Sequence, residues 1–242
     1  MKNINPKERF YRNIIDSSRL KKYEVKVEET DLLVFSEKYL DNEIKREVMI
    51  QRQIIKNYIH WNPEFYTSFS PVVYKSQEEI IKLMCLSAEM TQTGPMASVA
   101  GAIAEVVGKK LLLPGEFFIE NGGDIYARID REFIVGVYAG TSPFSMKVGI
   151  KLKGSNIPVG IATSSGSVGH SFSYGNADAV TVISRSATFS DGAATYFGNI
   201  VKGSIEQKII EEELRRFPFV EGLLIIKGEE MFLWGEMELV SF

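Results

Sequence analysis

The order of helical and strand-like patterns along the chain most constrains its fold. Apolar residues recur at helical spacing over residues 38–59, and residues 77–89 and 96–110 predict two further helices. From Glu116 onward, short apolar runs separated by glycine-rich turns predict strands instead. Early helices followed by later strands favour an α+β fold over an alternating βαβ fold. We expect one domain over residues 1–242, with antiparallel or mixed sheets, N-terminal helices and a strand-rich C-terminal part.

Several further elements are predicted. A capping-box spacing at Ser76-Gln77-Glu78-Glu79 opens one helix, and Asn62-Pro63 ends the long helix before it. The other predicted helices cover residues 6–18, 191–202 and 204–216. The predicted strands cover residues 23–28, 31–35, 117–120, 125–129, 133–138, 147–153, 159–163 and 179–184, with a closing hairpin around 223–226 and 231–234.

Composition excludes several classes of protein. A net charge of −3 lacks the basic footprint of a nucleic-acid-binding protein. No apolar run approaches the roughly 18 residues of a membrane span, and no apolar stretch follows the basic N-terminal residues as it would in a secretory signal. We therefore expect a cytoplasmic protein without a nucleic-acid or membrane partner. One cysteine, Cys85, and two histidines, His60 and His170, cannot build a disulfide or a structural zinc site by themselves.

Charge is also unevenly distributed along the chain. Residues 1–60 contain 23 charged side chains, whereas residues 161–200 contain three and are rich in serine, threonine, glycine and alanine. Small residues let backbone approach backbone or a ligand closely. The usual phosphate-loop, dinucleotide, nucleophile-elbow and zinc-protease motifs are absent. Candidate chemistry must therefore come from less familiar polar clusters.

The first polar cluster is Glu120-Asn121-Gly122-Gly123-Asp124, directly after a predicted strand. Glycine pairs permit positive φ, and the flanking carboxylates can meet a cation or ribose hydroxyls. The alternative is an ordinary tight hairpin turn, which the residue chemistry favours.

The second cluster covers residues 163–171. Its hydroxyls and backbone amides can form an anion-binding nest, in which His170 can act as an acid, a base or a phosphate ligand. A polar surface loop with a solvated histidine explains the same residues equally well. The candidate binding residues are Thr163, Ser164, Ser165 and Gly166.

The third cluster covers residues 190–199. Asp191 and Thr195 are four residues apart, so on a helix they share one face. A carboxylate and a hydroxyl at this spacing can hold part of a Mg²⁺ shell, with ligand phosphates supplying the rest. The alternative is an N-cap at Ser190 or Asp191 with an ordinary polar face, and the residues alone favour it.

In this order, the three clusters resemble the motifs of the ApbE superfamily of flavin transferases. Those enzymes carry an Asn-x-Gly-Gly-Asp turn, a Gly-x-Ala-Thr-Ser-Gly stretch leading to a histidine, and an Asp-Ala-x-Ala-Thr helix start. A closer resemblance, over nearly the full chain, is to a cytosolic branch of that superfamily whose activity is not established. The segments that carry it are residues 8–12, 94–105, 120–124, 163–173 and 176–179.

The resemblance implies an activity and roles for individual residues. In the transferases, FMN is moved from FAD onto a threonine of a protein acceptor, with AMP leaving and Mg²⁺ bound against the pyrophosphate. Carried over to this chain, Asp191 and Thr195 become the metal pair, and His170 lies near the phosphates. Asn121, Gly122, Gly123 and Asp124 then shape the pocket for the flavin nucleotide.

Departures from the family pattern support an alternative function. Transferases have a lysine where this chain has Ala100, so the missing cation would have to come from Lys109, Arg128 or Arg185. The alternative is a non-enzymatic ligand-binding or accessory protein on the same fold. The family's association with sulfide assimilation and homocysteine formation in anaerobes provides a setting for that role. A homodimer is a further expectation.

Overall fold

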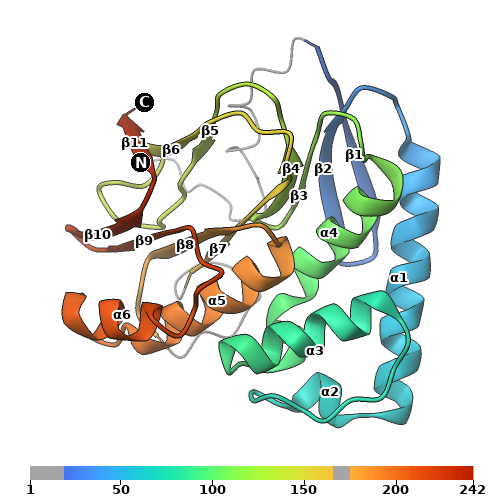
Figure 1. Cartoon of the computed structure of the whole chain (residues 1–242), viewed down its shortest axis with the longest axis horizontal. Coiled ribbons are helices and arrows are strands. Elements are labelled where there is room, and N and C mark those ends of the chain that lie inside the picture. The colour runs from blue at the N-terminus through green and yellow to red at the C-terminus, as the bar shows by residue number, and fades with distance from the viewer. Residues whose placement is uncertain (1–18, 166–174, 242) are drawn as a thin grey trace.

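Residues 19–165 and 175–241 are described by a computed structural model (Figure 1). The predicted helix at residues 6–18 lies outside the described residues, as do Gly166 and His170. The described chain is α+β, as predicted, with its longest helix early and most of its strands after residue 116.

Two antiparallel sheets form the framework. The larger sheet has the strand order β1-β2-β3-β4-β7-β8-β9-β10, and the smaller has the order β11-β6-β5. In the larger sheet the strands are β1 (Lys21–Val27), β2 (Thr30–Ser36), β3 (Phe117–Asn121), β4 (Asp124–Arg128), β7 (Val159–Ser164), β8 (Ala179–Ser184), β9 (Gly222–Lys227) and β10 (Glu230–Gly235). The smaller sheet contains β5 (Phe133–Gly136), β6 (Val148–Leu152) and β11 (Glu238–Ser241).

Helices cover one face of the larger sheet, and the smaller sheet packs on the other face (Figure 1). Along β2, Leu32 and Val34 join the core beneath the helices, whereas Leu33 and Phe35 join the core between the sheets. This alternation follows from the two-residue period of a strand. The helices are α1 (Asp41–Trp61), α2 (Glu64–Thr67), α3 (Glu79–Thr91), a 3₁₀ turn (Pro95–Ser98), α4 (Val99–Leu111), α5 (Ala187–Ile200) and α6 (Gln207–Leu214).

Two predictions about individual elements are wrong, and one strand was not predicted. The capping box does not form, because Glu78 is the N-cap of α3 and makes no side-chain cap hydrogen bond. Helix α5 begins at Ala187 rather than at position 191, with Ser186 as its N-cap. The last strand, β11, was not expected. No helix in the described part of the chain is long and apolar enough to cross a membrane.

Small residues hold α5 against its neighbours. A Cβ atom on Gly101 of α4 would lie 2.4 Å from the Ala187 carbonyl oxygen. A Cβ on Gly160 of β7 would lie 2.1 Å from the Ala187 amide nitrogen, and one on Gly192 would lie 2.5 Å from the Ser87 hydroxyl of α3. Helix α5 therefore sits in direct backbone contact with α4 and β7, which places its second turn beside the start of α4.

Candidate functional site

The Asn121–Asp124 segment forms the tight hairpin turn that joins β3 to β4, as its sequence favours. Asn121 pairs with Asp124 across the ladder. Gly122 has a φ of +68° and Gly123 a φ of +110°, a region that side chains with a Cβ rarely adopt. A Cβ on Gly122 would have no atom of the described residues within 4 Å, so no described element covers the outer side of this turn.

Polar side chains at this turn are tied to neighbouring elements. The Asn121 side-chain amide donates to the Ala100 carbonyl oxygen of α4 at 3.0 Å. Glu120 Oε1 accepts a hydrogen bond from the Gly123 amide at 2.7 Å. Asp124 accepts one from the Thr163 amide of β7. The turn therefore has two roles: it closes a hairpin, and it brings two buried carboxylates to the start of α4.

Asp191 lies at the same place, although the predicted N-cap role is wrong. Ser186 caps α5 by accepting a hydrogen bond from the Phe189 amide at 3.3 Å. Asp191 is in the second turn of α5, where it is 9% exposed, and its Oδ2 accepts from the Gly101 amide at 2.9 Å. It also accepts from the Ala100 amide. Asp191 thus caps the N-terminus of α4, a different helix.

The buried carboxyls at this point perturb one another. Burial raises the pKa of Asp124 well above its ordinary value, and the charges of Asp191 and Glu120 raise it further. Burial also raises the pKa of Asp191 to about 7, although the Gly101 and Ala100 amides favour the charged form. Two neighbouring buried carboxyls near neutral pH either share a proton, so that only one is ionised, or are both ionised with a cation between them. The cluster is therefore suited to a positive ion.

Thr195 lies one helical turn after Asp191, so the two side chains share a face of α5 as predicted. It is partly exposed, and its hydroxyl makes no hydrogen bond within the described residues. Carboxylate and hydroxyl oxygens are hard donors of the kind that Mg²⁺ prefers. Among the described residues, no group of three or more His, Cys, Asp or Glu side chains is arranged to hold a metal ion. A cation here would need water or ligand oxygens beside Asp191, Thr195 and Asp124.

The predicted anion-binding segment is only partly described. The Thr163 hydroxyl forms a hydrogen bond with the Thr181 hydroxyl of the neighbouring strand β8, at 2.9 Å. Ser164 is the last residue of β7, and Ser165 follows it. Because Asp124 accepts from the Thr163 amide, this strand end adjoins the carboxylate cluster. The nest at Gly166 and the role of His170 stay predictions, since both residues lie outside the described part of the chain.

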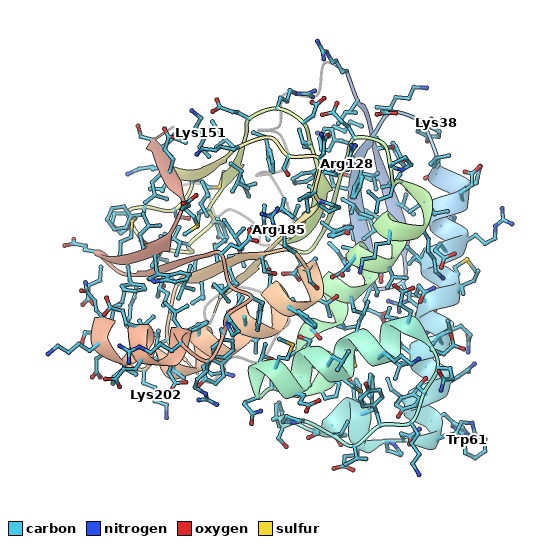
Figure 2. All side chains as sticks on the ribbon, in the orientation of Figure 1. Lys38, Trp61, Arg128, Lys151, Arg185 and Lys202 are labelled. Atoms are coloured by element: carbon cyan, nitrogen blue, oxygen red, sulfur yellow. The ribbon has the colours of Figure 1, made fainter. Side chains whose placement is uncertain are left out.

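None of the three basic residues proposed to replace the lysine missing at Ala100 serves the cluster. Lys109 is eight residues beyond Gly101, about 12 Å along α4. Arg128 is four residues beyond Asp124, about 13 Å along β4, and Arg185 lies in the connection between β8 and α5 (both are labelled in Figure 2). Their partners are Glu105 for Lys109 (2.6 Å), Asn156 for Arg128 (2.9 and 3.1 Å) and Glu221 for Arg185 (2.6 Å).

Sequence reasoning missed Glu105. It is 1% exposed on α4, where its Oε2 accepts hydrogen bonds from Ser186 and Thr188 at the start of α5. A signal was present: Glu105 is the one charged residue in the otherwise apolar and small segment 94–108. A lone carboxylate in such a segment indicates a buried partner.

Comparisons with known proteins agree with this fold. The model of a protein family described as AbpE bacteria matches residues 12–216. A UPF0280 protein of Methanococcus aeolicus is 38% identical over 216 residues, covering 86% of this chain and 87% of the relative. A UPF0280 protein of Archaeoglobus fulgidus is 36% identical over 231 residues, covering 91% and 94%.

Two solved structures share the fold at low sequence identity. The flavinyl transferase ApbE of Pseudomonas stutzeri superposes with a TM-score of 0.56 at 13% identity, covering 89% of this chain and 93% of that one. The ApbE protein of Thermotoga maritima gives a TM-score of 0.54 at 14% identity, covering 90% and 97%. At these identities the likeness concerns the fold.

Proposed function

Because the chain belongs to the AbpE bacteria family, a branch of the ApbE-like superfamily, we propose that it binds a flavin nucleotide or a related pyrophosphate together with Mg²⁺. Asp191 and Thr195 hold the metal, with Asp124 beside them. The hairpin turn at Asn121, Gly122 and Gly123 forms one wall of the nucleotide pocket. Transfer of FMN from FAD to a threonine of an acceptor protein is the reaction that this site would support.

The observation that carries this proposal is the buried carboxylate pair Asp124 and Asp191. A fold that brings two carboxyls together out of solvent raises the pKa of both, which disfavours their charged forms. A bound Mg²⁺ would stabilise the charged forms of both carboxylates, and it would also offset the negative charge of a pyrophosphate. The Thr195 hydroxyl, which makes no hydrogen bond within the described residues, lies on the same face of α5 and would supply a third oxygen.

The residues beside the pair have supporting roles in this proposal. Thr163, Ser164 and Ser165, at the end of β7, are proposed to line the phosphate side. Gly166 and His170, outside the described residues, keep the phosphate-binding roles that the resemblance implies. The cation and the phosphates would lie next to each other beside the hydrogen bond from the Asn121 side-chain amide to the Ala100 carbonyl oxygen. Positioning and charge compensation then do most of the work, as in other phosphate-transfer chemistry.

Titration of FAD against the purified protein, with and without Mg²⁺, tests the proposal. We expect Mg²⁺-dependent binding that weakens at least about tenfold in Asp191→Asn and Thr195→Val, the loss typical of removing a metal ligand or its support. Asp178→Asn is the matched control, because Asp178 also accepts a hydrogen bond from a glycine amide, that of Gly228, outside the site. FAD binding absent under both conditions, or equally weakened by Asp178→Asn, contradicts the proposal.

A second candidate function rests on Ala100. The position lacks the basic side chain of the transferases, and Lys109, Arg128 and Arg185 are paired elsewhere. This favours a protein that binds its ligand without transferring FMN, as an accessory factor. Mg²⁺-dependent FAD binding without AMP release, across a panel of threonine-bearing acceptor proteins, would favour this function over transfer.

A further inference from the structure

Helices α4 and α5 cap one another through buried carboxylates. Asp191 of α5 accepts from the Gly101 amide at the start of α4, as described above. In return, Glu105 of α4 accepts from the Thr188 amide at the start of α5 at 3.0 Å. Each helix therefore supplies an acceptor for a first-turn amide of the other.

The Glu105 contact is more extensive than a cap needs. Its Oε2 also accepts from the Ser186 hydroxyl at 2.6 Å and the Thr188 hydroxyl at 2.8 Å. Its Oε1 accepts from the Lys109 ammonium at 2.6 Å, so both oxygens are engaged although the side chain is only 2% exposed. Ser186 already caps α5 on its own account, through the Phe189 amide. Capping the N-terminus of α5 therefore does not by itself explain why the Glu105 carboxylate is buried.

We propose that Glu105 is a positioning residue that fixes where α5 presents Asp191; its relevance to Mg²⁺ rests on the function proposed above. Gly101 and Glu105 are one turn apart on α4, and Thr188 and Asp191 are one turn apart on α5. Two contacts one turn apart on each helix define both the rotation and the translation of α5 against α4. If the Glu105 contact is lost, α5 can shift and carry Asp191 with it.

The test variant is Glu105→Gln, which keeps the shape of the side chain. A glutamine has one acceptor oxygen and one amide group that only donates, so it cannot accept from both Lys109 and the three donors of α5. Glu47→Gln is the matched control: Glu47 lies on α1 and accepts from Lys110 of α4 at 2.7 Å, so this carboxylate also pairs with a lysine of α4 but from a helix other than α5. Thr188→Val removes one hydroxyl donor to Glu105 and is the milder variant if Glu105→Gln does not fold.

The primary measurement is hydrogen exchange of the Gly101 amide, relative to the Val107 amide in the middle of the same helix. We expect Glu105→Gln to accelerate Gly101 exchange about tenfold more than Val107 exchange, because the Asp191 bond to Gly101 weakens locally. Glu47→Gln should leave this ratio unchanged. A purely stabilising role for Glu105 would accelerate both amides alike, and that result would overturn the inference.

Mn²⁺ affinity, measured by electron paramagnetic resonance without nucleotide, links the positioning to the proposed metal site. We expect about tenfold weaker Mn²⁺ binding in Glu105→Gln, in line with other residues that orient metal ligands. Wild-type affinity in Glu105→Gln would overturn the link between Glu105 and the metal. If the wild-type protein binds no Mn²⁺, the proposed function fails, while the Gly101 to Val107 ratio still decides whether Glu105 positions Asp191.

Discussion

Replacing Asp191 by asparagine should make the stability of the protein less dependent on pH. The pKa of Asp191 is raised from its ordinary 3.8 to about 7 by burial. The folded protein therefore keeps a proton on Asp191 that the unfolded chain releases near pH 4. Across that window the folded state binds more protons, so its free energy of unfolding falls as pH rises, until the folded group has ionised above about pH 7.

The size of the effect follows from the raised pKa. The two units between pH 5 and pH 7 correspond to about 3 kcal/mol, at roughly 1.4 kcal/mol for each unit. A chain of this size changes its melting temperature by roughly 2–4 °C for each kcal/mol. In EDTA, the wild type should therefore lose about 6–12 °C more than Asp191→Asn between pH 5 and pH 8. Asparagine keeps an oxygen that can accept from the Gly101 amide, so the cap of α4 is retained.

Thermal denaturation at pH 5 and pH 8, with and without Mg²⁺, measures this difference. Mg²⁺ should raise the melting temperature of the wild type more at pH 8 than at pH 5, because it binds the charged carboxylates. It should leave Asp191→Asn nearly unaffected. Asp178→Asn serves again as the control and should follow the wild type. Equal losses for wild type and Asp191→Asn between the two pH values would refute the reasoning.

Three further predictions concern the surroundings of the site. Gly122→Ala should cost about 1–2 kcal/mol of stability, because φ is +68°, even though no atom of the described residues lies within 4 Å of the new Cβ; urea denaturation measures the loss. Gly101→Ala should cost about 1–3 kcal/mol and also weaken the response of the melting temperature to Mg²⁺, because its Cβ would lie 2.4 Å from the Ala187 carbonyl oxygen. Cys85 is buried, and burial raises the pKa of its thiol to about 12, so a thiol reagent should label it only after denaturation; rapid labelling of the native protein would contradict this.

Strands and the long helices could be predicted from sequence because their apolar periods are regular. The β1–β2 hairpin, α1 and the strands from β3 to β10 were all found close to their observed bounds. The start of α5 was missed because residues 187–190 (Ala, Thr, Phe, Ser) carry no charge or strong helical period, and Asp191 resembles a helix start. The strand β11 was missed because it has four residues and is defined by its pairing with β6.

The candidate site could be predicted only in part. The order of the motifs predicted Asn121, Asp124 and Asp191 as site residues, and the structure places all three beside the start of α4. That Asp191 caps α4 rather than α5 depends on the packing of two helices some 90 residues apart, which no local pattern contains. The role of Glu105 was hidden for the same reason, since its partners come from the start of α5.

The mutual capping of α4 and α5 also bears on the order in which the chain acquires its structure during synthesis. Strands β1 to β4 are neighbours in the sheet, and α4 packs on them, so this part can assemble before α5 leaves the ribosome. Until α5 emerges, however, Glu105 has no donors from Ser186 or Thr188, and the Gly101 amide has no acceptor from Asp191. The nascent chain therefore carries, at the same surface, a Glu105 Oε2 without its donors from α5 and a Gly101 amide without its acceptor. Docking of α5 satisfies both at once, so the same contact that joins the two helices also brings Asp191 to the site.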